Sequence, residues 1–324
     1  MQKKIIFFQW SKKKKREDYA FVIMQEAIKK NMITLHTGPE ILKNIEYHDF
    51  HDKICSKYSF LSKIWYPFYI PINMLKRKEK YILLFNEWHP ALNNLKFFEW
   101  LKKKYDVKIV LVIRNMIYNK NHPEVRNVSI YKLKNIFNLI VTDEKIDADL
   151  YNLYFLPDPF SIITHKKAQC KNDLCFIGLD KGRKKLLKEI ASSALKNDIK
   201  YNIKIIGKGK DAIIEYTDYQ PYLDLIKQDM QSNCILEVLQ PGQECFTLRL
   251  QEAVCLGKKL LTNNKNVVNE KYYNPKYVQI FDNVDDIDWN FVKEKIEVDY
   301  EYKGEYSPVN FVNKIIDELE KSND

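Results

Sequence analysis

Four polar side chains that could bind a charged ligand lie close together in the second half of the sequence. Glu244 and Glu252 are separated by seven residues, and Thr247 and Arg249 lie between them. Hydroxyl and guanidinium groups can donate hydrogen bonds to a phosphate, whereas a carboxylate accepts them, for example from sugar hydroxyls. Because glutamate is a common residue, the alternative is that both glutamates are solvated charges beside a helix.

The elements predicted around these residues favour the site. Residues 234–239 form an apolar run of strand length, and residues 241–243 (Pro-Gly-Gln) indicate a turn. From Thr247 onward, apolar residues recur at the spacing of one helical face. Gly257 ends this helix, and residues 258–263 are predicted to form the next strand. The polar side chains therefore lie at a strand-to-helix loop, where the free N–H groups and the dipole of the helix favour an anion.

The segment ECFTLRLQEAVCLG resembles the donor-binding motif of GT-B glycosyltransferases, in which two glutamates seven residues apart bracket a small loop and a helix start. The resemblance implies that Glu252 binds the ribose hydroxyls of a nucleotide and that Glu244 lies near the donor sugar. It also implies that the phosphates lie on the helix N-terminus, at Phe246 and Thr247. The chain departs from the motif at Thr247, where the family usually has Gly, and at Val238, where it often has Pro.

A second resemblance is to bacterial polysaccharide glycosyltransferases that have a GQ-x-x-x-T-x-R-x-x-E core followed by KKL-x-T-x-N. Both patterns occur here, at residues 242–252 and 258–264. This resemblance adds Gln243 and Arg249 to the predicted site. In that group the first glutamate is not a fixed feature, so Glu244 can be accidental.

The GT-B resemblance extends to the start of the second half of the chain. In the family, a strand that ends in Phe-x-Gly presents Arg and Lys to the diphosphate. Phe176 and Gly178 fit this pattern, followed by Arg183 and Lys184, although Leu179 stands where the family has Arg. Gly207, at the end of a predicted strand, and Tyr219, in the loop beyond it, complete the predicted donor site. An aromatic ring in that loop could stack on a nucleotide base, and the alternative is an ordinary packed tyrosine.

The best acid/base candidates in the first half follow a predicted strand at residues 81–85. Glu87 and His89 belong to the sequence NEWHP at its carboxyl end, where α/β active sites collect polar residues. A lone histidine is more often structural or merely exposed.

Alternating strands and helices in both halves predict an α/β fold with two doubly wound Rossmann-like domains, the architecture of GT-B enzymes. The proline-rich segment at residues 157–159 and the polar stretch behind it indicate the boundary. We expect an acceptor-binding domain at residues 1–165 and a nucleotide-sugar-binding domain at residues 166–324.

Charge is distributed unevenly along the 324 residues. Residues 1–172 contain 31 Lys and Arg against 17 Asp and Glu, whereas residues 173–324 contain 22 against 26. A basic half can meet an anionic membrane surface, a phosphate-bearing acceptor or nucleic acid. The stretch 58–78 mixes aromatic residues with Lys and Arg, as an interfacial membrane segment does. The alternative is a core helix with a proline-containing loop.

Two Asp-x-Asp triplets, Asp147–Asp149 and Asp286–Asp288, suggest a metal-dependent GT-A transferase as an alternative. Neither lies at the end of a predicted buried strand, so chance acid pairs are the better interpretation. Arg249, Arg183 and Lys184 supply enough positive charge at the donor loop that we expect no metal and no cofactor. The non-enzymatic alternative is a basic nucleic-acid-binding protein, which no known motif supports.

The sequence therefore predicts a metal-independent glycosyltransferase that moves a hexosyl or related sugar from a nucleotide sugar to a saccharide or lipid-linked acceptor. The resemblance implies a role in surface polysaccharide biosynthesis, such as lipopolysaccharide or capsule, and retention of configuration. Glu87, His89, Glu244 and Arg249 are the predicted catalytic residues. No apolar run is long enough to span a bilayer, and the six cysteines show no metal-binding spacing. We expect a cytoplasmic protein, peripheral at the anionic inner face of the membrane, with no nucleic-acid partner.

Overall fold

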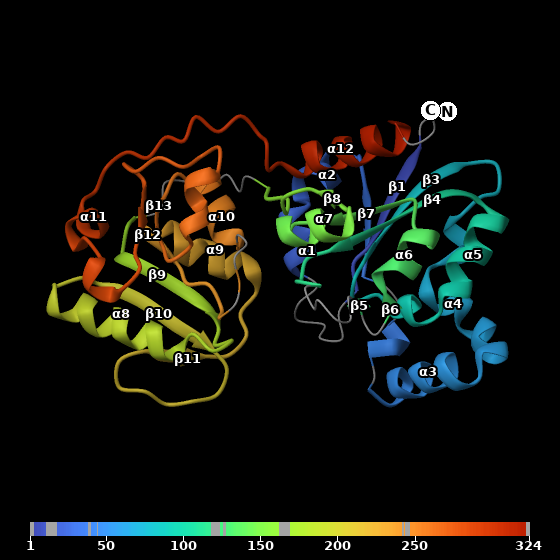
Figure 1. Cartoon of the computed structure of the whole chain (residues 1–324), viewed down its shortest axis with the longest axis horizontal. Coiled ribbons are helices and arrows are strands. Elements are labelled where there is room, and N and C mark those ends of the chain that lie inside the picture. Colours follow the sequence, from blue (N-terminus) through green and yellow to red (C-terminus); the bar gives the residue numbers. More distant parts are fainter. Residues whose placement is uncertain are drawn as a thin grey trace. The chain divides into compact units, whose positions relative to one another are not determined.

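The computed structural model describes residues 3–10, 18–37, 40–43, 45–117, 124–125, 128–161, 169–241, 243 and 247–321. The chain divides into two compact units (Figure 1). Unit 1 comprises residues 1–159 and 307–324, and unit 2 comprises residues 160–306. Among the described residues, no helix is long and apolar enough to cross a membrane.

Unit 1 contains a six-stranded sheet in the order β2-β1-β3-β4-β7-β8, and every pairing in it is parallel. Its strands are β1 (Lys4–Phe8), β2 (Thr34–His36), β3 (Lys80–Asn86), β4 (Asp106–Ile113), β7 (Leu139–Thr142) and β8 (Tyr154–Phe155). The central strands are nearly continuous apolar runs because helices cover both of their faces. The strand order reverses between β1 and β3, so ligands are expected outside the carboxyl ends of these two strands.

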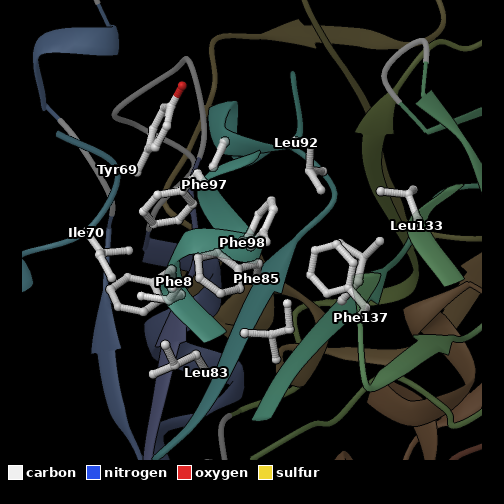
Figure 2. Close-up of a cluster of buried hydrophobic side chains, with 14 of the residues drawn as sticks. Phe8, Tyr69, Ile70, Leu83, Phe85, Leu92, Phe97, Phe98, Leu133 and Phe137 are labelled. Atoms are coloured by element: carbon white, nitrogen blue, oxygen red, sulfur yellow. The ribbon is translucent and has the colours of Figure 1, made fainter. Parts of the chain in front are cut away.

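The core on one face of this sheet is rich in aromatic side chains. Alternate residues of β1 and β3, including Phe8, Leu83 and Phe85, pack against Phe97 and Phe98 of α5 (Leu95–Lys104), as Figure 2 shows. The rings of Phe8 and Phe85 are stacked with centroids 5.1 Å apart. The same cluster includes Tyr69, Ile70 and Leu133, so it ties several segments to one side of the sheet.

The remaining elements of unit 1 are short helices and one small hairpin. They are α1 (Asp18–Ile23), α2 (Gln25–Lys29), η2 (Glu40–Lys43), α3 (Ile45–Lys57), η3 (Ser59–Trp65), α4 (Tyr66–Tyr69), η4 (Ile72–Met74), η5 (Pro90–Asn93), β5 (Glu124–Val125), β6 (Val128–Ser129), α6 (Ile130–Ile136) and α7 (Lys145–Tyr151). The chain ends with α12 (Pro308–Lys321), which packs against α2.

The position of α12 differs from the predicted domain organisation. A boundary at 165/166 places this helix in the second domain, whereas its contacts assign residues 307–324 to unit 1. The chain therefore passes between the units twice, and the Phe160 N–H donates to the Tyr306 carbonyl at 2.7 Å where the two passages meet. The amphipathic pattern of α12 predicts that one of its faces is buried, but it does not predict which of the two units that face packs against.

Unit 2 contains the second six-stranded sheet, in the order β11-β10-β9-β12-β13-β14, and again every pairing is parallel. Its strands are β9 (Asn172–Leu179), β10 (Tyr201–Ile206), β11 (Glu215–Thr217), β12 (Ser232–Glu237), β13 (Lys259–Thr262) and β14 (Val278–Ile280). Counted along unit 2 alone, this is the Rossmann order 3-2-1-4-5-6. The prediction of an α/β fold with two doubly wound domains is confirmed.

Helices cover both faces of the second sheet. They are α8 (Lys184–Lys196), α9 (Tyr222–Met230), α10 (Leu248–Leu256), η6 (Lys265–Asn269), η7 (Val284–Asp286) and α11 (Trp289–Lys293). Leu187 and Ile190 of α8 pack on Phe176 of β9 in one cluster. Helices α9 and α10 both contact β12. The helix predicted from Thr247 begins at Leu248 and ends at Gly257, which has the left-handed φ of 60° expected of a helix-ending glycine.

Candidate functional site

The strand order of unit 2 reverses between β9 and β12, and this defines where a ligand is expected. Residues 180–183 follow β9 and lead into α8. Residues 238–247 follow β12 and lead into α10. Both loops therefore begin at the carboxyl edge of the sheet, on the two strands that flank the reversal. Of the residues predicted for the donor site, Arg183, Gln243 and Thr247 lie in the described parts of these two loops.

The first loop is a tight turn with an unusual backbone. The Arg183 N–H donates to the Asp180 carbonyl at 2.9 Å, and the two residues between them, Lys181 and Gly182, have φ angles of 45° and 81°. Positive φ at both central positions is the type I′ geometry, which glycine adopts easily and lysine does not. A β-carbon at Gly182 would lie 3.4 Å from the Pro241 ring, so this turn lies against the loop that follows β12.

Arg183 connects the two loops. Its Nη1 donates to the carbonyl of Val238 at 2.9 Å and its Nε to the carbonyl of Asp180 at 3.1 Å, while Nη2 donates to the carbonyl of Leu179. Burial, together with the positive charge of Arg249, lowers the pKa of Arg183 to about 10. At neutral pH the side chain therefore remains a cation, held by backbone carbonyls rather than by a carboxylate.

Gly178 makes room for Arg183. A β-carbon at Gly178 would lie 3.3 Å from Nη2 of Arg183 and 3.2 Å from the ring of Phe176. The guanidinium carbon of Arg183 lies over the same ring, 5.0 Å from the ring centre. The Phe-x-Gly pattern thus positions an arginine in this chain, although that arginine comes five residues after the glycine rather than directly after it.

The N-terminus of α10 is fixed by a buried carboxylate that sequence reasoning did not include in the site. Glu237, the last residue of β12, is fully buried, and its Oε1 accepts from the Thr247 hydroxyl at 2.6 Å and from the Thr247 N–H at 3.0 Å. Its Oε2 accepts from the hydroxyl of Thr262 at 2.6 Å. Burial raises the pKa of Glu237 despite these donors. Its position at the end of a strand beside the reversal was the available signal.

Thr247 caps α10, as the sequence predicts. Its hydroxyl oxygen accepts from the Arg249 N–H at 3.2 Å, so one of the first N–H groups of the helix is satisfied within the chain. Gln243 lies in the preceding turn, where its N–H donates to the carbonyl of Gln240 at 3.0 Å. The predicted residues Glu244 and Phe246 lie outside the described residues.

Arg249 and Glu252 belong to a buried ion network. The Arg249 Nη1 lies 2.8 Å from Asp229 Oδ2 and 2.6 Å from Glu252 Oε2, and its Nη2 donates to the carbonyl of Ile177 at 2.6 Å. Oε1 of Glu252 accepts from the hydroxyl of Tyr222 at 2.6 Å. Only 2% of the Glu252 surface is exposed.

This network changes what the two residues can do directly. A ribose that hydrogen-bonds to Glu252 would have to reach a carboxylate that is covered and already accepts two bonds. The Arg249 guanidinium likewise contacts two carboxylates and a carbonyl of β9. In this structure both side chains join α10 to α9 and β9, and their predicted roles at ribose and phosphate remain predictions.

The other predicted donor residues lie around the same edge of unit 2. The Lys184 N–H donates to Asp180 Oδ1 at 2.9 Å, and its Nζ lies 5.3 Å from the centre of the Tyr216 ring. Gly207 has a φ of 150°, and no atom lies within 4 Å of the position its β-carbon would take. Tyr219 is half-buried in the segment between β11 and α9. Of this group, Lys184 is the one adjacent to Arg183.

The carboxyl edge of the sheet in unit 1 carries a second group of charged residues. At the reversal, Asn86 pairs with the backbone of Trp10 by two hydrogen bonds, of 3.0 Å and 2.8 Å. Glu87 follows directly, is 5% exposed and accepts from Nδ2 of Asn115 at 2.5 Å. Burial raises the pKa of Glu87, while its hydrogen bond from Asn115 and the charge of Arg114 oppose the rise.

Three charged residues from neighbouring strands accompany Glu87. Nε of Arg114, after β4, lies 2.7 Å from Oδ1 of Asp158, and both side chains are about one-tenth exposed. Asp143, after β7, has a pKa raised well above the usual range by burial and by the charge of Asp158. None of these residues was among those predicted for the site. Their shared position at one sheet edge becomes evident only when the strands are paired.

His89 does not have the geometry predicted for it. The ring is completely buried, its Nε2 lies 3.2 Å from the carbonyl of Tyr69, and its Nδ1 accepts from the Ala91 N–H at 3.3 Å. These partners require the proton on Nε2, so the ring has no nitrogen left to exchange a proton with an acceptor. In this structure His89 packs in the aromatic core, and its acid/base role remains a prediction.

The Asp-x-Asp triplets have structural roles. Oδ2 of Asp147 accepts from the Ile117 N–H at 2.6 Å inside unit 1. Asp286 closes the capping box of η7, and Asp288 caps α11. Among the described residues, no group of three or more His, Cys, Asp and Glu side chains is arranged to hold a metal ion.

Two doubly wound parallel sheets, with polar loops at the strand-order reversal, place the chain in the GT-B architecture. Comparison with solved structures agrees. An alpha-glucosyltransferase in complex with UDP and a 13-mer DNA containing a HMU base has a TM-score of 0.59 and 10% identity, covering 98% of each chain. A second alpha-glucosyltransferase complex, with UDP-glucose and DNA containing an abasic site, has a TM-score of 0.55 and 11% identity. It covers 98% of this chain and 100% of that one.

A putative UDP-N-acetylglucosamine 2-epimerase from Listeria monocytogenes is also similar, with a TM-score of 0.50 and 8% identity over 99% of this chain and 98% of that one. No protein-family model and no curated protein matches the sequence. At these identities the likeness establishes the fold.

The comparisons correct one sequence-based expectation. We expected no nucleic-acid partner, because no nucleic-acid motif is present. That expectation is wrong, because two of the structures that share this fold are transferases bound to DNA. A nucleic-acid motif is therefore not required for this fold to bind DNA.

Proposed function

We propose that this protein is a glycosyltransferase that uses a nucleotide sugar and that the diphosphate of the donor binds in unit 2 between turn 180–183 and loop 238–247. The observation that carries the proposal is Arg183, a cation at the strand-order reversal that donates to the carbonyls of both loops. A diphosphate could replace those carbonyls as the acceptor of its N–H groups. Charge-assisted bonds of this kind are roughly twice as strong as neutral ones.

The proposed reaction breaks the bond between the sugar anomeric carbon and the β-phosphate oxygen, and it forms a bond to an acceptor oxygen. The electron pair of the broken bond remains on the nucleoside diphosphate, and the acceptor hydroxyl loses its proton. Arg183 and the N-terminus of α10 stabilise the growing phosphate charge, which is usually the largest contribution to such catalysis. The role of Glu87 as proton acceptor stays a prediction from the sequence, made for unit 1 by itself. Arg249 and Glu252 act in this proposal by positioning α10.

A panel of nucleoside diphosphates and nucleotide sugars tests the donor site. The two alpha-glucosyltransferase neighbours were solved with UDP and with UDP-glucose, so a UDP-sugar is the first candidate donor. A ligand at a hundred times its dissociation constant should raise the free energy of unfolding by about 2.7 kcal/mol. If no member of the panel raises the melting temperature, the donor site in unit 2 is wrong.

A nucleotide-sugar epimerase is the second candidate, because the epimerase neighbour shares the fold. The two activities give different products from the same donor. Incubation with UDP-N-acetylglucosamine alone, followed by separation of the sugar epimers, reveals an epimerase. Release of UDP that depends on an added acceptor reveals a transferase.

We propose a saccharide or lipid-linked acceptor, in surface polysaccharide assembly, and DNA as the competing acceptor. The DNA in both alpha-glucosyltransferase complexes supports the second choice, as does the excess of Lys and Arg in residues 1–172. Transfer of radiolabelled sugar from the donor identified above, to DNA in one reaction and to a lipid extract in another, distinguishes them.

We also propose that transfer is metal-independent, because Arg183, Lys184 and the α10 N-terminus together supply positive charge at the phosphates. Turnover should survive an excess of EDTA. Loss of turnover in EDTA that manganese or magnesium restores would contradict this part of the proposal.

A further inference from the structure

Two side chains at the carboxyl edge of the unit 1 sheet carry buried polar atoms whose hydrogen bonds are unmet. They are Nη1 and Nη2 of Arg114, after β4, and Oδ1 of Asp143, after β7. None of these atoms has a hydrogen-bond partner among the described residues. Burying a polar atom without a hydrogen bond is costly, so such atoms in a folded protein indicate a place for water or a ligand.

The guanidinium of Arg114 is held in one place, so its unmet N–H groups are a fixed feature of this edge. Its carbon lies 5.9 Å from the centre of the Phe7 ring and 5.7 Å from the centre of the Tyr19 ring. Nε lies 2.7 Å from Oδ1 of Asp158, and the Tyr19 hydroxyl donates to Oδ2 of the same carboxylate at 3.3 Å. These contacts involve the guanidinium carbon and Nε, and they leave Nη1 and Nη2 for a further partner.

Three carboxyl groups accompany this arginine, so the edge is not a simple anion site. Burial raises the pKa of Glu87 and of Asp143, the charge of Asp158 adds to both rises, and the charge of Arg114 opposes them. An anion on Arg114 would meet these carboxyl groups, whereas a cation on the carboxyl groups would meet Arg114. A neutral hydroxyl suits both, because its oxygen accepts from a guanidinium while its hydrogen donates to a carboxyl oxygen.

An exposed tryptophan follows Glu87 directly at the same edge. Trp88 is 50% exposed, although its two neighbours in the chain, Glu87 and His89, are 5% and 0% exposed. The His89 N–H donates to the Asn86 carbonyl at 3.0 Å, so residues 86–89 form a tight turn. Because the residues on both sides are buried, the indole is held at the surface where β3 ends, beside the strand-order reversal.

The loops around these residues are apolar or acidic rather than basic. Met116, after β4, is 40% exposed. Arg114 is the one basic side chain in the described residues of the loops after β3, β4 and β7, and its Nε is paired with Asp158. The acidic side chains of these loops are Glu87, Asp143 and Glu144. A nucleic acid brings phosphates that require Lys and Arg contacts, whereas an uncharged sugar requires none.

We propose that Trp88, Arg114 and Asp143 bind an uncharged saccharide, with sugar hydroxyls on the two polar side chains and a C–H face of the ring on the indole. Hydroxyls satisfy the unmet atoms, and the apolar face covers the exposed tryptophan. As an acceptor site, this edge rests on the proposed transferase function and supports the saccharide among the proposed acceptors. Sugar binding itself is measured with no donor present.

A panel of methyl glycosides tests the site. Saturation-transfer NMR on the full chain, with the methyl glycosides of glucose, galactose, mannose and N-acetylglucosamine, should show binding of at least one. Trp88→Ala should weaken that binding at least about fivefold, the effect of losing one aromatic contact. The matched control is Tyr131→Ala, which removes a ring that is 59% exposed on α6 and should bind like the original chain.

Asp143→Ala tests the polar half of the site. It should weaken glycoside binding about fivefold, which corresponds to one neutral hydrogen bond. The melting temperature should not fall, because Oδ1 of Asp143 has no partner among the described residues to lose. Asp149→Ala is the matched control, since the Asp149 side chain is 70% exposed on α7.

Equal glycoside affinities in Trp88→Ala and Tyr131→Ala would overturn the proposal, and so would a failure of every glycoside to bind. It would also be overturned if a single-stranded oligonucleotide binds in place of the glycosides and Trp88→Ala loses that binding. Glycoside binding that depends on Trp88, in a chain that binds no nucleoside diphosphate, would support this site and refute the proposed transferase.

Discussion

Arg183 is the residue on which the proposed donor site depends. Its guanidinium reaches both loops at the strand-order reversal because Gly178 leaves room beside it and Phe176 lies beneath it. Arginine suits this position better than lysine, because its rigid planar fork holds five N–H donors in fixed directions, whereas lysine has three donors on one flexible point charge.

Arg183→Ala should weaken binding of the nucleoside diphosphate at least about tenfold, which corresponds to the loss of one charge-assisted hydrogen bond. The affinity of Arg183→Lys for the nucleoside diphosphate should lie between those of the original chain and Arg183→Ala. Titration calorimetry measures both, and Lys185→Ala is the matched control because Lys185 is exposed on the same turn of α8. Equal affinities in Arg183→Ala and the control would remove Arg183 from the donor site.

Asp229 gives the buried network of unit 2 a pH dependence. Burial raises its pKa from 3.8 to about 7, and the negative charge of Glu252 adds to the effect, whereas Arg249 opposes it. One guanidinium thus faces two carboxyl groups away from water, and Asp229 keeps its proton to a higher pH than an exposed aspartate does. Between pH 3.8 and about 7, Asp229 is therefore protonated in the folded state and ionised in the unfolded state, so the folded state binds more protons.

The sign follows from that difference in bound protons. The contribution of Asp229 to the free energy of unfolding should fall as the pH rises through the window from 3.8 to about 7. Asp229→Asn cannot titrate and should not show this fall. Urea unfolding of both proteins at about pH 5 and about pH 8 compares them, and parallel pH profiles would refute the assignment.

At the scale of elements, α10 is positioned by contacts at its first turn. Thr247 caps the helix and also donates to Glu237 at the end of β12, so the helix start and the strand end are joined through one side chain. This contact holds the helix N-terminus at the sheet edge, where the proposed phosphates bind.

Thr247→Ala should lower the free energy of unfolding by about 1–2 kcal/mol, the usual cost of losing a helix cap, because it also removes a donor from the buried Glu237. Thr247→Ser keeps the hydroxyl and should recover most of that loss. Chemical denaturation of the two variants side by side gives the comparison. If Ser and Ala are equally destabilising, the methyl group rather than the hydroxyl is what matters.

At the scale of the whole molecule, the chain returns to unit 1 for its last helix. Phe311, Ile315 and Leu319 of α12 are buried, and α12 packs against α2, far away in the sequence. The stability of unit 1 therefore depends on residues that follow all of unit 2.

Ile315→Ala should destabilise unit 1 by about 2–4 kcal/mol, as large-to-small substitutions in a core do, while unit 2 keeps its protection. Hydrogen exchange followed by peptide mapping can locate the change, and faster exchange in β1 and β3 without change in β9 and β12 is expected. Asn313→Ala is the control, since Asn313 is exposed on the same helix. Equal loss of protection in both units would show that they unfold together.

The sequence by itself determined the type and order of most elements. Local patterns predicted β3, β12 and β13, and helical spacing with a terminal glycine predicted α10, because these signals come from residues a few positions apart. The same local signals gave the two-domain α/β class and placed Thr247 at a helix start. They missed the helices α3, α5 and α6 and the strand β11.

The tertiary structure decided which polar side chains are available. His89 and Glu87 lie two residues apart in one segment, yet one is enclosed by the aromatic core and the other borders a charged edge. Arg249 meets Asp229, and Arg183 meets Val238, only because β9 and β12 are neighbours in the sheet. Local spacing specifies a strand or helix face, but burial and hydrogen-bond partners depend on contacts between residues distant in the sequence, which a pattern along the chain does not contain.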